Sequence, residues 1–190
     1  MNRKISYRDY HEKDAKRYPF FRYHPDPLRS GVFVEHETPK VCQCCGRQET
    51  LICEGPFYTD EEVEYVCPEC IADGSAAKRF DMEYCEIAAK DRVSDPKKDE
   101  ELLHHTPGFY SYNGSCWPSH CDDYCIYVEE LYRKHLQDKE LMEELVKDPV
   151  WIEWEFDSPE KVLLDQYIQV HMFVCPHCGK HLFYIDEFFD

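Results

Sequence analysis

The sequence has no apolar run long enough to span a membrane, and no signal peptide opens it. Its first residues, 1–17, are polar and charged instead. We therefore expect a cytoplasmic protein with no membrane partner. Because that compartment keeps thiols reduced, the 12 cysteines of the chain favour metal binding over disulfides.

Basic residues are also scarce: 22 Lys and Arg stand against 39 Asp and Glu, which gives a net charge of -17. Contact with phosphate requires a basic surface, so direct nucleic-acid binding is disfavoured unless a local basic patch exists. The best candidate for such a patch is the N-terminal stretch 3–22, but acidic residues are mixed into it. An acidic surface favours a basic protein partner and speeds encounter with it. The alternative is that the charge provides only solubility.

What the sequence does contain is enough apolar material for a core, with 43% hydrophobic and 15% aromatic residues. We predict an α+β fold made of small zinc-stabilised modules, of treble-clef or zinc-ribbon type, with short antiparallel strands and flanking helices. The predicted parts are an N-terminal arm (1–19), a first zinc module with a helix (20–100) and a second zinc module with an inserted charged helix (101–190). Together they are expected to form one compact unit.

Local patterns predict the elements within these parts. Two closely spaced prolines exclude a helix from residues 20–28, which we expect to be extended and held by aromatic side chains. Apolar spacing predicts helices over 71–90 and 126–146, the second ended by Pro149, on either side of a charged linker at 91–100. Strands are predicted at 50–53, 63–66, 168–174 and 181–189.

The first candidate metal site has the clearest spacing. Two CxxC pairs, Cys42 with Cys45 and Cys67 with Cys70, are separated by a stretch that can form a hairpin. Four thiolates satisfy the tetrahedral preference of Zn²⁺, and a glycine after the first pair, Gly46, permits a tight turn. These four cysteines are therefore predicted to hold a structural zinc ion.

A third CxxC pair, Cys175 and Cys178, is followed by a glycine as Cys45 is, and it predicts a second zinc ion. Its partner pair is less evident. We expect Cys121 and Cys125, spaced CxxxC, with Cys116 or His120 as a possible replacement for one of them.

Signatures of zinc enzymes are missing. The chain contains no HExxH, and its CxxC pairs lack the preceding proline of the zinc deaminase pattern. A catalytic zinc keeps one coordination position open, whereas the pairs here supply four ligands each. We therefore expect a protein that is not an enzyme.

Acidic side chains gather in three places that a basic partner would contact. A first run comprises Asp60, Glu61, Glu62 and Glu64, and two further pairs are Asp122 with Asp123 and Glu129 with Glu130. The alternative for each cluster is a solvated face with no partner.

Several motifs occur in an order that resembles a known family. They are the run Phe21–Leu28, Cys42-x-x-Cys45-Gly46, Gly55-Pro56-x-Tyr58, Cys67–Ala77, Thr106–Phe109, Trp117-x-x-His120-Cys121-x-Asp123-x-Cys125 and Cys175-x-x-Cys178-Gly179. This pattern is similar to the CbrC-like family, which is named for a colicin-tolerance protein. The resemblance implies a protective role against a bacterial toxin.

Acidity, structural zinc and this resemblance lead to one main hypothesis. It is an immunity- or tolerance-type protein that binds a basic toxin domain, with nucleases the leading class, and neutralises it by occlusion. The alternative is a zinc-dependent enzyme or a nucleic-acid-associated zinc-ribbon adaptor.

Overall fold

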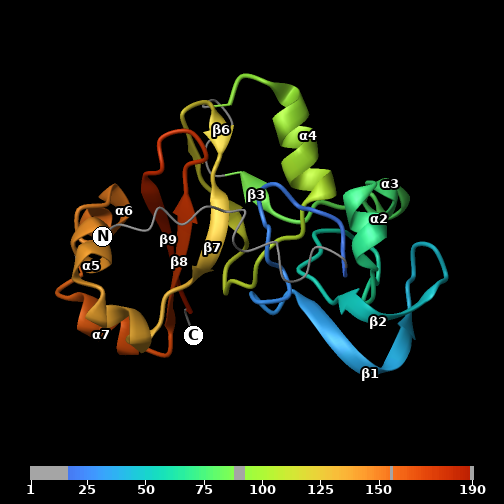
Figure 1. Ribbon diagram of the computed structural model, residues 1–190, viewed down its shortest axis with the longest axis horizontal. Helices are drawn as coiled ribbons and strands as arrows, with labels where there is room; N and C mark the ends of the chain where they lie inside the picture. Colours follow the sequence, from blue (N-terminus) through green and yellow to red (C-terminus); the bar gives the residue numbers. More distant parts are fainter. Residues whose placement is uncertain (1–16, 88–92, 155, 189–190) are drawn as a thin grey trace. The chain divides into compact units, whose positions relative to one another are not determined.

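The computed structural model describes residues 17–87, 93–154 and 156–188, and these form a mixed α+β protein with short strands and helices, as predicted (Figure 1). The described residues divide into two compact units. The first contains the chain up to Cys85 together with Pro96–Tyr110, and the second contains Glu86–Asp95 and the chain from Ser111 onward. The chain thus leaves the first unit, returns to it and leaves again. Most of the predicted N-terminal arm, up to residue 16, lies outside the described residues.

The first unit is built on one antiparallel hairpin, β1 (Phe33–Val41) and β2 (Gln48–Cys53). The strand predicted at 50–53 is confirmed. The strand predicted at 63–66 is reduced to a single bridge between Val66 and Cys53. The segment 20–28 forms no helix or strand. Its aromatic side chains Phe21 and Tyr23 are buried as expected, with Phe21 contacting Phe33 edge to face at 5.6 Å, whereas Phe20 is exposed.

One long helix was expected from residue 71 to 90, and this is wrong. The structure has two short helices, α2 (Pro68–Ala72) and α3 (Ser75–Phe80), followed by Asp81 at a positive φ of 46°. The break occurs at Gly74, whose φ is 72° and whose missing Cβ would lie 2.5 Å from the His105 ring. Only glycine fits there, and the backbone it permits is not helical. Residues 88–90 of the predicted helix lie outside the described residues.

The expected charged linker at 91–100 is also wrong over its second half. Residues Pro96–His105 form the helix α4, with proline at the first helical position, where its missing N–H costs nothing. Its apolar residues Leu102 and Leu103 are buried.

The second unit centres on a three-stranded antiparallel sheet in the order β7 (Ile126–Glu130), β8 (Ile168–Val174), β9 (His181–Glu187). The predicted strands 168–174 and 181–189 are confirmed, the latter as far as Glu187. Two smaller pairings complete the unit: β3 (Glu86–Ile87) runs parallel to β4 (Cys116–Trp117), and β5 (Ser119–His120) forms a hairpin with β6 (Asp123–Tyr124).

The helix predicted over 126–146 is wrong at its start. Ile126-Tyr127-Val128 is β-branched and aromatic, and strand pairing with β8 overrides the helical spacing. Helical structure begins only at η2 (Arg133–Gln137) and continues in α5 (Lys139–Leu145). Pro149 does not end a helix but starts α6 (Pro149–Glu153), which is followed by α7 (Pro159–Leu164).

The helices α5, α6 and α7 lie on one side of the β7–β8–β9 sheet (Figure 1). There they cover Val170, Met172, Phe183 and Ile185. The other face packs Phe173 against Trp117, with ring centroids 5.5 Å apart. Both faces of the sheet are therefore covered. Nowhere in the described chain is a helix long and apolar enough to cross a bilayer.

Candidate metal centres

Two groups of four side chains bring potential ligand atoms together. One group is Cys42, Cys45, Cys67 and Cys70, and the other is His120, Cys121, Cys175 and Cys178. Within each group all four ligand atoms lie within 4.8 Å of one another. Each group could therefore hold one metal ion. All 12 cysteines are free thiols in the structure, with no disulfide among them.

The first centre forms at the turn that joins β1 to β2. The Cys42 N–H donates to the Arg47 carbonyl at 2.8 Å, and the Gly46 N–H donates back to the Cys42 carbonyl at 2.8 Å. Gly46 has a φ of 77°, a conformation that favours glycine. This tight loop presents Cys42 and Cys45 on one side.

The other two ligands of the first centre come from the start of α2. Cys67 is the N-cap residue of that helix, and Cys70 lies within it. The Cys67 N–H donates to Cys42 Sγ at 3.3 Å, so a backbone hydrogen bond joins the start of α2 to the hairpin loop. A hairpin loop and a helix start facing one metal are the treble-clef-like arrangement that the sequence predicts.

The sulfur spacing fits a tetrahedral ion. Metal–sulfur bonds of about 2.3 Å, directed to tetrahedral corners, place two sulfurs about 3.8 Å apart. The distance between Cys45 Sγ and Cys67 Sγ is 3.8 Å. All four thiols predicted for this site are brought together.

A fifth residue, Arg47, completes the first centre and was missed by the sequence analysis. Its Nε donates to Cys45 Sγ at 3.3 Å and its Nη2 donates to Cys67 Sγ at 3.4 Å, so one guanidinium joins both ligand pairs. Burial raises the pKa of the Cys45 thiol, but the hydrogen bonds from Arg47 outweigh it and bring the pKa down to about 6. The sequence signal for this role is a basic residue directly after the glycine of the CxxC loop.

The second centre repeats this loop at the turn between β8 and β9. The Cys175 N–H donates to the Lys180 carbonyl at 2.8 Å, the Gly179 N–H donates to the Cys175 carbonyl at 3.0 Å, and Gly179 has a φ of 73°. Cys175 and Cys178 are therefore presented as Cys42 and Cys45 are.

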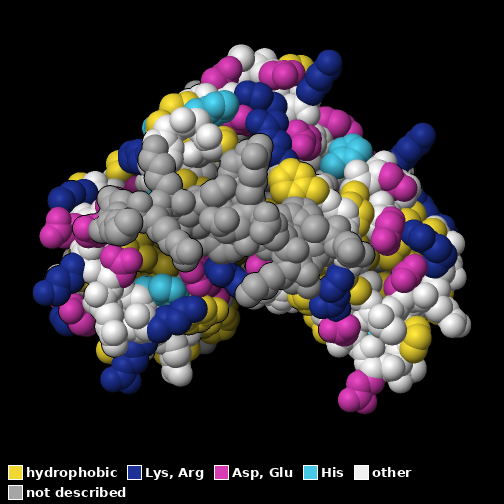
Figure 2. Space-filling view, viewed as in Figure 1, with side chains coloured by type: hydrophobic (Ala, Val, Ile, Leu, Met, Phe, Trp, Pro, Cys, Tyr) yellow, Lys and Arg dark blue, Asp and Glu magenta, His cyan; other side chains and the backbone are white. Residues whose placement is uncertain are grey.

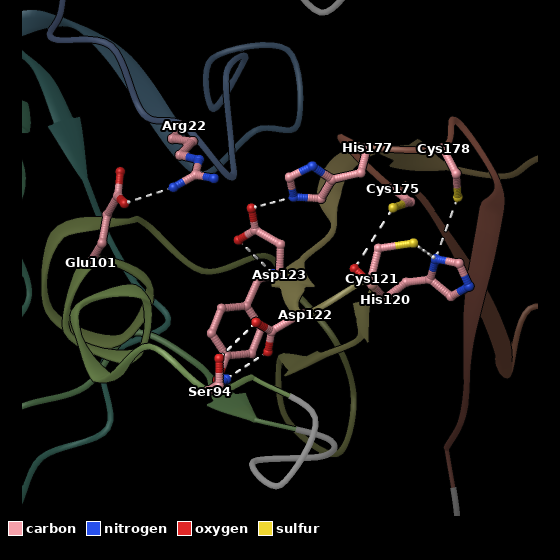
Figure 3. A network of polar contacts seen from close by, with 11 residues as sticks. Arg22, Ser94, Glu101, His120, Cys121, Asp122, Asp123, Cys175, His177 and Cys178 are labelled. Atoms are coloured by element: carbon pink, nitrogen blue, oxygen red, sulfur yellow. Dashed lines mark hydrogen bonds and ion pairs between the residues drawn. The ribbon is translucent and has the colours of Figure 1, made fainter.

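The remaining ligands of the second centre come from the β5–β6 hairpin. Cys121 and Asp122 form its two-residue turn, with φ values of 54° and 57° that match a type I′ turn. His120 Nδ1 lies 3.2 Å from Cys121 Sγ and 3.4 Å from Cys178 Sγ (Figure 3). A nitrogen and a sulfur on one tetrahedral ion would be about 3.6 Å apart, so the donor set fits.

The fourth member of this group is thus His120 rather than the predicted Cys125, which lies outside the group of four. The cause is the position of the turn. Residues 120 and 121 stand at the tip of the hairpin, whereas Cys125 lies further along it, where its N–H donates to the Pro118 carbonyl at 3.0 Å. Cys125 is fully buried, and Cys116, the other alternative, also lies outside the group.

Next to the second centre, a buried carboxylate pairs with a histidine of the CxxC loop. His177 Nε2 lies 2.9 Å from Asp123 Oδ2, and Figure 3 shows the His177 ring directed toward Asp123 rather than toward the sulfurs. Asp123 is fully buried, so its predicted role as an exposed partner contact is wrong.

The other predicted acidic contacts fall into two classes. Asp122 accepts hydrogen bonds from Ser94, Glu129 lies 3.3 Å from Lys134 Nζ, and Glu130 accepts from the Tyr132 hydroxyl. These three carboxylates therefore already have partners within the chain. By contrast Asp60, Glu61, Glu62 and Glu64 are all exposed, and none of the described cations forms an ion pair with them.

Comparison with known proteins identifies a family. A model of an uncharacterised protein family, UPF0167, matches residues 18–187. UPF0167 proteins of Mycobacterium bovis and Mycobacterium tuberculosis are each 34% identical to this chain, covering 88% of it and 92% of the relative. One from Pseudomonas aeruginosa is 31% identical, covering 88% of this chain and 96% of the relative. No solved structure matches. The chain therefore belongs to the UPF0167 family.

Proposed function

We propose that this chain is a zinc-stabilised binding protein of the immunity or tolerance type, which neutralises a basic bacterial toxin domain by covering its surface. The leading class of toxin is a nuclease, whose substrate requires a basic surface. In this proposal both metal ions are zinc, because thiolate and imidazole donors at tetrahedral spacing are the set that structural zinc prefers.

One observation carries the proposal: a loop of carboxylates that form no ion pair with any of the described cations is held in place by the CxxC loop of the first candidate metal centre. We call residues 60–64, which contain Asp60, Glu61, Glu62 and Glu64, the acidic loop. Gln43 lies between Cys42 and Cys45 in the sequence. Its side chain makes three hydrogen bonds to backbone groups at the end of the acidic loop and just after it. Gln43 Nε2 donates to the Glu62 carbonyl at 3.1 Å, and Gln43 Oε1 accepts from the N–H groups of Glu64 and Tyr65 at 2.6 and 2.9 Å.

These contacts link metal binding to recognition. The metal fixes the CxxC loop, the CxxC loop fixes Gln43, and Gln43 fixes the backbone of the acidic loop. Because the loop is ordered before the partner arrives, binding would not carry the entropic cost of ordering the loop. Its uncompensated negative charge would speed association with a basic surface.

Acidic and basic side chains are interspersed on the coloured part of the face drawn in Figure 2. Mixed charges of this kind favour solubility more than recognition. The acidic loop is therefore the stronger candidate for a docking element than the net charge as a whole.

A binding role is favoured over catalysis by the ligand count. Each centre offers four side-chain ligands, whereas a catalytic zinc keeps a position for water or substrate. The resemblance to the CbrC-like family supports a protective role, and the free thiols fit a reducing cytoplasm.

The test is co-expression with the toxin domain encoded beside this chain, followed by co-purification at low salt and a cell survival assay. We expect a complex that salt weakens, and we expect cells that express this chain to survive expression of the toxin. Glu61→Lys should weaken the complex, whereas Glu153→Lys, the same charge change at an exposed site on α6, should not. Absence of a complex and of protection would refute the proposal, and equal weakening by both variants would refute the role of the acidic loop.

A further inference from the structure

The two metal centres share one loop but differ in what protects their thiolates. In the first centre Cys42, Cys67 and Cys70 are buried, and only Cys45 is exposed. In the second centre only Cys175 is buried, while Cys121 and Cys178 are exposed and His120 is partly exposed. Solvent and competing ligands therefore reach two sulfurs of the second centre and one of the first.

The one exposed sulfur of the first centre has a cation beside it. Arg47 donates to Cys45 and also to Cys67, so its guanidinium ties the exposed sulfur to a buried one and partly neutralises the sulfur charges. Such outer partners of metal ligands typically contribute about 10- to 100-fold in metal affinity.

The second centre has a basic residue at the same place in its loop, and it does not act in this way. Lys180 follows Gly179 as Arg47 follows Gly46. Among the described residues, however, no hydrogen bond or ion pair joins the Lys180 ammonium to a ligand sulfur, and its charge acts on Asp148 instead. A lysine ammonium also lacks the planar fork with which arginine reaches two sulfurs at once.

From these differences we propose that the two centres have different functions in metal handling. The Cys42–Cys45–Cys67–Cys70 centre retains its zinc as a permanent part of the fold. The His120–Cys121–Cys175–Cys178 centre exchanges its zinc with competing thiolate or nitrogen ligands, so that the protein responds to zinc supply. A competing ligand enters at the exposed Cys121 or Cys178 and replaces the protein ligands one by one.

Exchange at the second centre would be transmitted to a nearby segment. Asp122 follows the ligand Cys121 in the β5–β6 turn, and its carboxylate accepts from the Ser94 N–H at 2.6 Å and from the Ser94 hydroxyl at 2.7 Å (Figure 3). Ser94 lies where the chain leads into α4. Zinc at the second centre therefore orders this connection by fixing the turn that holds it.

The experiment follows zinc release from the full chain loaded with two zinc ions, using an excess of the chromogenic chelator 4-(2-pyridylazo)resorcinol. We expect two phases, each of one zinc per chain, with rates that differ at least about tenfold. Refilling the fast centre with Co²⁺ should give the absorption of a site with three thiolates and one imidazole. Amide exchange at Ser94 should rise when only the fast zinc is removed.

Two matched variants test whether the Arg47 side chain slows zinc release from the first centre. Arg47→Met should accelerate the slow phase about 10- to 100-fold and leave the fast phase unchanged. Lys180→Met, at the equivalent place in the other loop, should change neither phase. A single rate for both ions, a four-thiolate Co²⁺ spectrum from the fast centre, or a slow phase insensitive to Arg47→Met would overturn the inference. No partner protein enters this experiment, so its outcome is independent of the proposed toxin binding.

Discussion

Replacement of Cys67 by serine tests whether the first centre holds the fold. The Cys67 sulfur is fully buried, lies 3.8 Å from Cys45 Sγ and accepts a hydrogen bond from Arg47. A serine hydroxyl is not a zinc ligand at neutral pH, so one tetrahedral position is lost. Structural zinc in small modules contributes about 10–16 kcal/mol of apparent binding free energy. A domain is stable by only about 5–15 kcal/mol, so loss of this ion should unfold the first unit.

The assay is zinc content by elemental analysis together with thermal unfolding followed by near-ultraviolet circular dichroism. We expect Cys67→Ser to bind one zinc per chain and to lose the ordered signal of the first unit. The control is Cys44→Ser in the same loop, because Cys44 is not in the ligand group and its sulfur donates to Ser75 Oγ at 3.5 Å. This control should retain two zinc ions. A Cys67→Ser protein that keeps two zinc ions and its melting temperature would refute the reasoning.

Three further predictions concern other parts of the structure. Gln43→Ala removes three hydrogen bonds, each worth about 0.5–1.5 kcal/mol, and should raise amide exchange at Glu64 at least about tenfold while zinc content stays at two; unchanged exchange would contradict the link between metal and acidic loop. His120→Ala should reduce the zinc content to one per chain, whereas Cys125→Ser should leave it at two, and the reverse result would restore Cys125 as the ligand. Burial lowers the pKa of His24 from 6.5 to about 4, so the unfolded chain binds this proton at a higher pH than the folded chain does. The corresponding stability, about 3 kcal/mol, is present above pH 6.5 and is lost as the pH falls toward 4; His24→Asn should flatten this part of the profile in urea unfolding, and an unchanged profile would contradict it.

Prediction from the sequence succeeded best for features that a local residue pattern determines. Both CxxC loops, with their glycines at positive φ, could be identified from spacing alone, because the loop geometry depends only on residues within it. The alternation of Val170, Met172 and Val174 likewise identified β8, whose neighbours cover both faces.

Predictions failed where tertiary contacts decide the outcome. Residues 126–130 have helical spacing but pair with β8, and no local feature shows that partner. His120 replaces Cys125 because the hairpin turns at 121–122, and a CxxxC spacing does not reveal where a turn falls. Arg47 was missed for a similar reason, since its hydrogen bond to Cys67 joins residues 20 positions apart.

The central claim, that both centres are saturated and that neither keeps an open position for catalysis, is tested most directly by X-ray absorption at the zinc edge. Measured on the two-zinc protein and on the one-zinc protein left after the fast ion is removed, the spectra report the ligands of each centre. The account predicts four sulfurs at the retained centre, and three sulfurs with one imidazole nitrogen at the other. A water or carboxylate oxygen bound to either zinc would reveal an open position and contradict the account.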